Sequence, residues 1–370
     1  MKIGFYLRDF SNGGVEMMTL RSAVELQQRG FDVVIIVNSN AGEMASLFIQ
    51  YFEVISLNLP RDMRTLKGVG SLLKAPLKLK LVCMSEKIKF LVSSKEQVNL
   101  INVFANSFLY SGTKSICYRH VPLDDSAGKD YGLFTHIMYK TVLRKADLLV
   151  GVSCKIVEQL KKKVGGSVRC EFIPNPVITE DLLEKSNDTG FAKEFLAWDG
   201  IRLLVVGRLT YQKGIDVLLN SLSQVRDDVG FVIIGEVESK EELTELSIKL
   251  GLGDRVFFLG FDENPYKYMR QADIFVLPSR YEGMPTVLIE AVYLNGSCLA
   301  ANCPTGPEEI VVMCGSGELF KVSDYDDLRD KIESQIERGK SIDFKPGGSS
   351  PFTVKASVDQ LFDCLNKVKD

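Results

Sequence analysis

Short apolar runs alternate with amphipathic helical segments twice along this 370-residue chain. The strands predicted in the first series are 2–7, 32–37, 54–56, 100–103, 115–118, 148–152 and 170–173. The helices predicted between them are 15–29, 64–75, 84–92, 132–145 and 154–163. Short buried strands separated by amphipathic helices are typical of parallel sheets with helices on both faces. The alternation therefore predicts an α/β fold built on doubly wound sheets.

Two prolines interrupt this alternation in the segment 173–177, where Pro174 and Pro176 fix an extended connector. A second series of strands is predicted at 203–207, 232–235, 256–259, 274–277, 297–300 and 317–320. We therefore expect a Rossmann-like domain over 1–174, a second one over 175–352, and a terminal helix over 353–370 that could cross back to the first. Ligands of such sheets bind at the carboxyl ends of the strands, so we expect the site in a cleft between the domains.

Two glutamates, Glu282 and Glu290, lie eight positions apart just after the predicted strand 274–277. Pro285 marks the start of a helix between them, because proline loses little in a first helical turn. The backbone N–H groups of a helix start attract phosphate, and carboxylates accept hydrogen bonds from sugar hydroxyls. A ligand with hydroxyls at both ends and an anionic middle fits this pattern. A nucleotide sugar is such a ligand.

Two cations, Arg208 and Lys213, lie in the loop that follows the predicted strand 203–207. A guanidinium fork and an ammonium group together suit a diphosphate. The loop lacks the spacing of a P-loop, and neither half of the chain has a G-x-G-x-x-G motif after its first strand. These residues therefore predict a diphosphate site formed by side chains, and they disfavour a dehydrogenase that uses NAD.

Positive charge is concentrated in the first half of the chain. Residues 1–180 carry 24 Lys or Arg and 16 Asp or Glu, out of totals of 45 and 48. Within the segment 61–90, eight Lys or Arg interleave with leucines and face only Asp62 and Glu86. A basic amphipathic segment can lie on an anionic membrane surface. The alternative is a solvated helix that packs on its own domain, and no nucleic-acid-binding motif accompanies the charge.

The eight cysteines of the chain form no C-x-x-C pair, which favours a reducing compartment over a zinc ribbon or a disulfide framework. The first residues read as a strand rather than a secretory signal, and no run of about 18 apolar residues occurs. We therefore expect a cytoplasmic protein, peripheral on the inner face of the plasma membrane if the basic segment binds lipid.

The motifs together resemble those of the retaining glycosyltransferases of the GT-B fold, in the large family-four group that builds bacterial surface polysaccharide and lipopolysaccharide. The motifs that carry the resemblance are Gly13-Gly14-Val15-Glu16, Asn175-Pro176-Val177, Gly207-Arg208 with Lys213-Gly214, Glu282-x7-Glu290 and Gly306-Pro307-Glu308-Glu309-Ile310-Val311. The match is more specific in the second half. The resemblance implies two Rossmann-like α/β/α domains that face a cleft, the first binding the acceptor and the second the nucleotide sugar.

The resemblance also implies roles in the second domain. Arg208 and Lys213 would contact the diphosphate, Glu290 would hold the ribose hydroxyls, and Glu282 would hold the transferred sugar. Phe261 falls where the base is usually held. The backbone of one short segment would complete the contacts with sugar and phosphate, and its residues are Gly283, Met284, Pro285 and Thr286.

Two further residues are implied in the first domain. Gly14 matches the glycine whose backbone approaches the donor phosphate, and His120 matches the histidine that reaches the sugar. With Arg208, Lys213 and Glu282, His120 completes the set expected to act in catalysis. Each residue alone has a plainer interpretation: a helix carboxylate, a surface ion pair, a turn, or a histidine that only supports the fold.

Sugar transfer leaves negative charge on the diphosphate, which Arg208, Lys213 and the helix start could neutralise without a metal ion. We therefore expect no cofactor and no metal, with a nucleotide sugar as co-substrate. The sequence Asp324-Tyr325-Asp326 imitates a metal-binding D-x-D motif, but Asp324 stands where a helix cap is expected. The resemblance implies retention of configuration by front-face displacement, with the leaving phosphate helping to deprotonate the acceptor.

The sequence says less about the identity of the donor and the acceptor than about the fold. The stretch 303–309 has Thr305 before Gly306-Pro307, where the commoner family form has two glycines, and it looks more like members that use UDP-galactose or UDP-N-acetylgalactosamine. We expect a saccharide or a lipid-linked glycan as acceptor. A non-catalytic module that binds sugar nucleotides and an epimerase of the same architecture are the alternatives.

Overall fold

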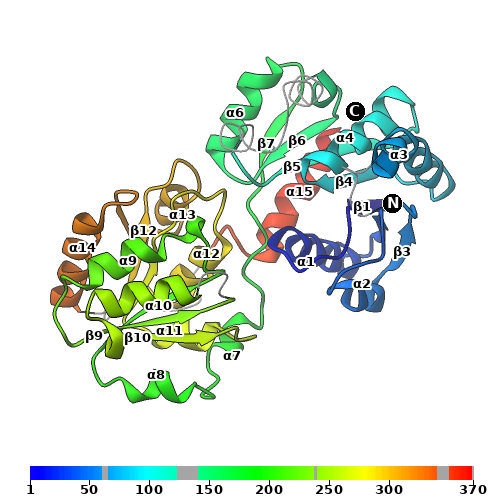
Figure 1. The fold of residues 1–370 in the computed structure, drawn as a ribbon. Helices are drawn as coiled ribbons and strands as arrows, with labels where there is room; N and C mark the ends of the chain where they lie inside the picture. Colours follow the sequence, from blue (N-terminus) through cyan, green and yellow to red (C-terminus); the bar gives the residue numbers. More distant parts are fainter. Residues whose placement is uncertain (61–65, 123–140, 237–239, 340–349, 369–370) are drawn as a thin grey trace. The chain divides into compact units, whose positions relative to one another are not determined.

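The computed structural model describes residues 1–60, 66–122, 141–236, 240–339 and 350–368 (Figure 1). The chain forms two compact units. Unit 1 comprises Met1–Pro176 and Phe352–Asp370, and unit 2 comprises Val177–Pro351. The chain thus passes from one unit to the other within the proline connector and returns to unit 1 for its last helix.

Unit 1 contains a seven-stranded sheet in the order β3-β2-β1-β4-β5-β6-β7, and every neighbouring pair is parallel. Its strands are β1 (Lys2–Leu7), β2 (Asp32–Val37), β3 (Glu53–Ser56), β4 (Phe90–Ser94), β5 (Lys114–Arg119), β6 (Leu148–Gly151) and β7 (Cys170–Phe172). Its helices are α1 (Gly14–Gln28), α2 (Ala45–Tyr51), α3 (Leu66–Ser85), α4 (Glu96–Val103), which runs into the π-helical turn η1 (Phe104–Phe108), α6 (Cys154–Val164) and α15 (Val354–Val368).

The core of unit 1 has two layers, one on each face of the sheet. Phe5 and Ile35 belong to the layer that includes residues of α1 and α15. Tyr6 and Ile36, one position further along the same strands, belong to the layer that includes residues of α3 and α4. Successive side chains of a strand point to opposite faces, so strands of continuous apolar sequence bury both faces, as the sequence predicts.

Two elements of unit 1 differ from the prediction. The segment 100–103, predicted as a strand, is the end of α4, and the segment 84–92, predicted as a helix, contains the end of α3 and the start of β4. All five residues of β4 are buried, as in a central parallel strand. In α4, Val98 and Ile101 are three positions apart and both are buried, which is helical spacing. The prediction is therefore wrong for both segments, since the predicted strand is helical and the predicted helix contains the start of a strand.

Two predicted helices of the first half touch residues that are not described. The helix predicted over 64–75 begins at Leu66 in α3 and continues to Ser85, through Pro76. Most of the helix predicted over 132–145 lies outside the described residues.

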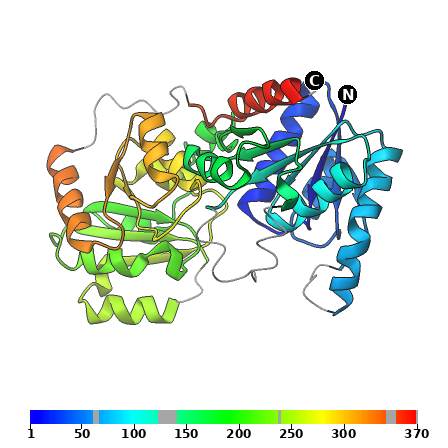
Figure 2. The same ribbon diagram turned by 90° about the horizontal axis from the view of Figure 1, so that it is seen from above.

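The last helix, α15, packs on α1 in unit 1 (Figure 2). Val358 and Leu361 of α15 are buried in the core layer shared with α1. Arg29, at the end of α1, forms an ion pair of 2.6 Å with Asp359, and the Ser357 hydroxyl donates to the Pro174 carbonyl at 2.6 Å. The C-terminal helix is therefore part of the unit that holds the N-terminus.

Unit 2 contains a six-stranded parallel sheet in the order β10-β9-β8-β11-β12-β13. Its strands are β8 (Ile201–Val206), β9 (Val229–Ile234), β10 (Val256–Gly260), β11 (Ile274–Leu277), β12 (Cys298–Ala301) and β13 (Glu318–Phe320). Its helices are α7 (Leu182–Lys185), α8 (Lys193–Ala197), α9 (Ile215–Leu222), α10 (Lys240–Lys249), α11 (Tyr266–Gln271), α12 (Thr286–Leu294), α13 (Pro307–Cys314) and α14 (Tyr325–Arg338), with 3-10 turns η2 (Tyr211–Lys213) and η3 (Gly253–Arg255).

Each sheet reverses its strand order once, between β1 and β4 in unit 1 and between β8 and β11 in unit 2. At such a switch point the loops after the two central strands leave the sheet in opposite directions, which opens a crevice at the carboxyl ends. The loops that carry the predicted site residues of unit 2 follow β8 and β11. Within the described residues, no helix is both long and apolar enough to span a bilayer.

Candidate functional site

The loops after β8 and β11 meet at the switch point of unit 2. Strands β8 and β11 pair directly, with Leu203 opposite Ile274, so their carboxyl ends are neighbours. Gly214, in the β8 loop, has a φ of 63°, and a Cβ placed on it would lie 2.2 Å from the Pro278 carbonyl oxygen of the β11 loop. The glycine is therefore required both by its left-handed backbone and by the close approach of the second loop.

Arg280 links these two loops. Its backbone N–H donates to the Gln212 carbonyl at 2.8 Å, and its guanidinium makes two bonds to the Asp216 carboxylate, at 2.9 and 2.6 Å. The guanidinium also lies 4.1 Å from the centroid of the Tyr211 ring. The hydrogen bond with Asp216 raises the pKa of Arg280. A planar fork that is both paired and stacked fixes the relative positions of the loops.

Lys213 and Glu282 form an ion pair across the two loops, with 2.7 Å between Nζ and Oε1. The same carboxylate oxygen accepts a hydrogen bond of 2.7 Å from the Ser279 hydroxyl, and the Glu282 carbonyl accepts one of 2.5 Å from the Thr305 hydroxyl. Glu282 is buried, whereas Lys213 is partly accessible. Burial, with the Glu282 carboxylate nearby as a smaller contribution, raises the pKa of the Cys303 thiol to about 12.

The ammonium of Lys213 can donate three hydrogen bonds. Within the described part of the chain, its one recorded hydrogen bond goes to Glu282. The group is thus held in place by Glu282 and keeps donors for an anion. Arg208, five residues earlier in the same loop, is exposed, and no bond from its guanidinium is found among the described residues.

Helix α12 begins beside this ion pair. Pro285 caps it, and the helix runs from Thr286 to Leu294, which confirms the start predicted near Pro285. The first-turn N–H groups of an α-helix have no partner within the helix. Gly306, with a φ of 91°, packs against this turn, since a Cβ on it would lie 2.5 Å from the Gly283 carbonyl oxygen. The glycine after Thr305 therefore lets the loop before α13 support the loop that carries Glu282.

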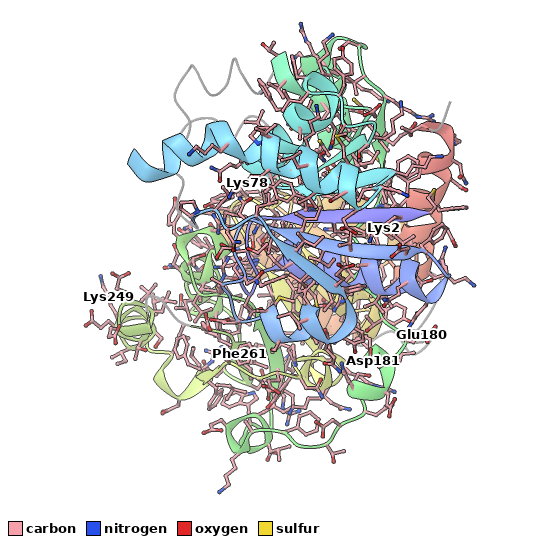
Figure 3. All side chains as sticks on the ribbon, turned by 90° about the vertical axis from the view of Figure 1, so that its right-hand side faces the viewer. Lys2, Lys78, Glu180, Asp181, Lys249 and Phe261 are labelled. Atoms are coloured by element: carbon pink, nitrogen blue, oxygen red, sulfur yellow. The ribbon has the colours of Figure 1, made fainter. Side chains whose placement is uncertain are left out.

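The other predicted residues of unit 2 lie further along the same elements. Glu290, one helical turn from the end of α12, is partly buried and accepts a hydrogen bond of 3.2 Å from the Tyr266 hydroxyl of α11. Phe261 follows β10 at the sheet edge and is exposed (Figure 3). Met284 is buried beside Pro285. The structure thus brings together Lys213 and Glu282, with the start of α12 close by. Among the described residues, the side-chain hydrogen bonds of Lys213 and Glu282 do not reach Phe261 or Glu290.

Unit 1 holds the two remaining predicted residues at its own switch point. Gly14 is exposed in the first turn of α1, directly after the cap residue Gly13. His120 follows β5, and its Nε2 lies 3.3 Å from the Ser94 hydroxyl at the end of β4. Burial, together with the positive charges of Lys95 and Arg119, lowers the pKa of His120 to about 4. The imidazole is therefore neutral at neutral pH.

Several supporting contacts escape sequence reasoning. In unit 1, Glu16 belongs to a motif named above, but its ion pair with Lys95 was not expected, nor was the ion pair of Arg119 with Glu96. In unit 2, Arg280 and Tyr266 orient the predicted residues but were not predicted. The sequence holds one signal for Arg280. It is a cation directly after a buried strand, and the carboxyl ends of parallel strands are where ligands bind. Its partner Asp216 is 64 positions away, so the pairing could be found only in the fold.

The D-x-D-like sequence caps a helix, as predicted. The Asp327 N–H donates to the Asp324 carboxylate at 2.9 Å at the start of α14, and Asp326 pairs with Arg329 at 2.7 Å. A cluster of three or more His, Cys, Asp or Glu side chains that could hold a metal ion is not found among the described residues.

Two family models match the chain in succession. The model described as Glycosyltransferase Family 4 matches residues 12–181, and the one described as Glycosyl transferases group 1 matches residues 187–343. The first matched region covers most of unit 1 and the second most of unit 2, so the motifs of both halves fall inside matched regions.

Curated relatives match over part of their length. An uncharacterized glycosyltransferase of Methanocaldococcus jannaschii is 30% identical over 224 residues, 58% of this chain and 54% of the relative. The N-acetylgalactosamine-N,N'-diacetylbacillosaminyl-diphospho-undecaprenol 4-alpha-N-acetylgalactosaminyltransferase of Campylobacter jejuni is 30% identical over 197 residues, 53% and 52% of the two chains. The lipopolysaccharide 1,6-galactosyltransferase of Escherichia coli is 25% identical over 195 residues, 51% and 52%. The chain spans about half the length of these relatives.

Solved structures match over the whole chain. A glycosyltransferase of Rickettsia africae superposes with a TM-score of 0.79 at 16% identity, covering 100% of this chain and 98% of that one. Anabaena HepE in complex with UDP and glucose gives 0.75 at 19% identity, with 99% of both chains covered. The lipopolysaccharide outer core galactosyltransferase WaaB gives 0.74 at 17% identity, with 100% of both covered. At these identities the likeness establishes the fold.

Proposed function

Because the chain belongs to the glycosyltransferases of the GT-B fold, in the family-four group of surface-polysaccharide type, we propose that it transfers a hexose or N-acetylhexosamine from a nucleotide sugar to a glycan acceptor. The observation that carries this proposal is the Lys213–Glu282 pair at the switch point of unit 2, beside the start of α12. A cation and a helix start can bind a diphosphate, and carboxylates nearby can bind hydroxyls.

The donor is proposed to bind along the β8 and β11 loops of unit 2. Lys213, Arg208 and the first-turn amides of α12 contact the diphosphate, with residues 283–286 completing the contacts. Glu282 holds the transferred sugar. Lys213 can keep its bond to Glu282 while it contacts the diphosphate, because its ammonium has three N–H donors. UDP as the nucleotide is supported by HepE, whose structure holds UDP and glucose.

Two residues are proposed to hold the nucleoside. Glu290 accepts hydrogen bonds from the ribose hydroxyls, with Tyr266 fixing one carboxylate oxygen. Phe261 offers an exposed aromatic face to the base. In unit 1, Gly14 lets the backbone approach the donor phosphate, because it is exposed in the first turn of α1 and has no side chain to stand between the backbone and a ligand.

The proposed reaction breaks the bond between the anomeric carbon and the diphosphate oxygen and forms one between that carbon and an acceptor oxygen. The proton of the acceptor hydroxyl passes to the leaving diphosphate, so the new bond forms on the same face and configuration is retained. Lys213 and Arg208 stabilise the charge that develops on the diphosphate, and this proposal needs no metal ion. His120, neutral at neutral pH, can hydrogen-bond a sugar hydroxyl but does not act as an acid.

The acceptor is proposed to be a saccharide or a lipid-linked glycan, used at the cytoplasmic face of the plasma membrane. The relative in Campylobacter jejuni carries diphospho-undecaprenol in the name of its acceptor. All eight cysteines of the chain are free thiols, which fits a reducing compartment.

A donor screen tests the proposal. Thermal shift with UDP-, GDP- and ADP-sugars should show stabilisation by a UDP-sugar, because a ligand that binds only the folded state raises the melting temperature. UDP release should then depend on an added saccharide or lipid-linked saccharide, and it should persist in EDTA. Binding without release under any acceptor would instead mark a binding module, and a strict need for a divalent ion would contradict the metal-free mechanism.

A further inference from the structure

The loop that follows β12 lies beside the β11 loop that carries Glu282. This β12 loop, residues 302–306, connects β12 to α13 (Figure 1). Strands β11 and β12 pair in parallel, with Leu277 opposite Ala300, so the two loops leave neighbouring strand ends. Three of the five residues of the β12 loop are buried, so most of its contacts are internal to unit 2.

The β12 loop contacts the β11 loop at its start, its middle and its end. The Cys303 thiol donates to the Ser279 carbonyl at 2.9 Å, and the Thr305 hydroxyl donates to the Glu282 carbonyl at 2.5 Å. Gly306 packs closely against the turn before α12, since a Cβ on it would clash with that turn. The segment that carries Glu282 is thus held along its length by the loop of the next strand.

Thr305 contacts Glu282 at its main chain. The Glu282 carboxylate accepts bonds of 2.7 Å from Lys213 and from Ser279, whereas its carbonyl oxygen accepts the bond from Thr305. Thr305 is only 1% exposed, so its hydroxyl is not available to a ligand that arrives from solution. Its branched Cβ restricts χ1, which keeps the hydroxyl in place. Thr305 can therefore affect a ligand only through the residue that it holds.

The position of the main chain matters because the Glu282 side chain is long. A glutamate has several side-chain torsions, so bonds at its carboxylate alone are compatible with more than one main-chain position. In the proposed donor complex, Lys213 also contacts the diphosphate and shares its N–H donors between two anions. The bond from Thr305 does not involve the ligand. It fixes the main chain from which the carboxylate extends, with or without a bound donor.

We propose that Thr305 is a positioning residue for recognition of the transferred sugar. By holding the Glu282 carbonyl, it keeps the carboxylate within hydrogen-bond distance of the sugar hydroxyls. The nucleoside and the diphosphate contact other groups in the proposed function, so the binding of UDP itself depends little on Thr305. Cys303 contributes less, because a thiol is a weak donor. The inference rests on the proposed function, since it assigns a role within the donor site.

Thr305→Val tests this role, because valine keeps the branched shape and removes the hydroxyl. Calorimetric titration of the full chain measures binding of UDP and of UDP-galactose or UDP-N-acetylgalactosamine, whichever raises the melting temperature more. Thr305→Val should weaken binding of the UDP-sugar roughly tenfold, since one buried hydrogen bond is lost, while the affinity for UDP should change less than about threefold. Thr305→Ser, which keeps the hydroxyl, should restore most of the affinity for the UDP-sugar.

Thr113 of unit 1 offers a matched control. It is buried, and its hydroxyl donates to the Ile88 carbonyl at 2.8 Å, so Thr113→Val removes the same kind of bond away from the donor site. Both valine variants should lower the melting temperature by similar amounts, because each leaves one buried carbonyl without that partner. A change in the ratio of the two affinities, for UDP-sugar and for UDP, is expected in Thr305→Val alone.

Circular dichroism shows whether Thr305→Val is folded. If it is not, Thr305→Cys takes its place, because a thiol is a weaker donor than a hydroxyl, and it should weaken binding of the UDP-sugar about threefold.

Three results would overturn the role of Thr305. They are an unchanged affinity for the UDP-sugar in the folded variant, an equal weakening of UDP and UDP-sugar, and a change of the affinity ratio in Thr113→Val as large as that in Thr305→Val. A wild-type protein that binds and turns over its donor, with a Thr305→Val variant that behaves like it, would contradict this inference alone. A wild-type protein that binds no nucleotide sugar would overturn the proposed function and this inference with it.

Discussion

The switch points of the two units carry the same kind of ion pair in opposite arrangements. In unit 2 the lysine, Lys213, follows the first strand and the glutamate, Glu282, follows the fourth. In unit 1 the glutamate, Glu16, follows the first strand and the lysine, Lys95, follows the fourth. In both pairs the carboxylate is buried and the lysine is partly accessible. One topology thus pairs two loops that are distant in sequence, and the residue types decide which loop offers the cation.

The two sites differ more in what surrounds the pair. In unit 2, Arg280 ties both loops together, and Lys213 has the exposed Arg208 in the same loop. In unit 1, the Ser11 hydroxyl donates to Glu16, α1 starts with Gly14 after Gly13, and the neutral His120 lies near Arg119, whose guanidinium is already paired with Glu96. Unit 2 is therefore prearranged for an anion, whereas unit 1 offers open backbone and an uncharged hydrogen-bonding group. Four predictions test this contrast, in order of decreasing expected effect.

The contrast predicts that Lys213→Ala lowers turnover by roughly 30- to 1000-fold, since the loss of one charge-assisted diphosphate contact costs about 2–4 kcal/mol. Steady-state UDP release measures this, with circular dichroism to show that the fold is intact. Lys213→Arg should recover part of the activity because it keeps the charge. The control is Lys249→Ala, an exposed lysine of α10 in the same unit (Figure 3). A loss of less than threefold in Lys213→Ala would remove Lys213 from the site.

The pH dependence of stability should report His120 in unit 1. Because its pKa is about 4 in the folded protein and 6.5 is the ordinary value, the unfolded chain takes up the proton first as pH falls. The contribution to stability is complete above about pH 6.5 and is lost as the pH falls through 4, in total about 3–4 kcal/mol.

Urea unfolding at pH 7.5 and 4.5 measures this loss. The wild type should lose about 2–3 kcal/mol more than His120→Gln, which cannot titrate. The second histidine of the chain is present in both proteins and cancels in the comparison. Equal losses in the two proteins would show that the imidazole is solvated rather than buried beside Lys95.

Arg280, which links the two loops of unit 2, should affect the binding of the donor. Arg280→Met removes the fork to Asp216 and should raise the KM for the donor roughly tenfold while changing kcat less, because the loops lose their fixed spacing. Arg226 offers a matched control, since it makes an equivalent fork to Asp228, at 2.6 and 2.7 Å, on an exposed edge. A similar KM effect in Arg226→Met would mean that general stability, not loop position, is responsible.

The smallest expected effect is a change in the pKa of His120, and it distinguishes Lys95 of unit 1 from Lys213 of unit 2. Lys95→Met should raise the pKa of His120, because a positive charge that disfavours the imidazolium is removed. NMR titration of the ring protons detects the change. The affinity for UDP, which unit 2 is proposed to bind, should change less than twofold. An unchanged pKa together with weaker UDP binding would reverse the assignment of the two units.

Local patterns were sufficient for most of the fold. The runs 2–7, 32–37 and 274–277 were predicted as strands and are strands, and the helix start near Pro285 was predicted from proline alone. The misassignment at 84–103 has a local cause. Lys87 and Lys89 interrupt the apolar run before β4, and the apolar residues of α4 are too few to show a period. Tertiary burial of all five β4 residues decided the outcome there.

The amino-acid order by itself determined the two parallel sheets, their proline connector and the chemistry available at the strand ends, because spacing and residue type are local properties. Tertiary structure alone decided which charges meet. Lys213 and Glu282 are 69 positions apart, and Arg280 and Asp216 are 64 apart. Strand order sets these meetings, since β8 and β11 become neighbours only when the sheet reverses between them.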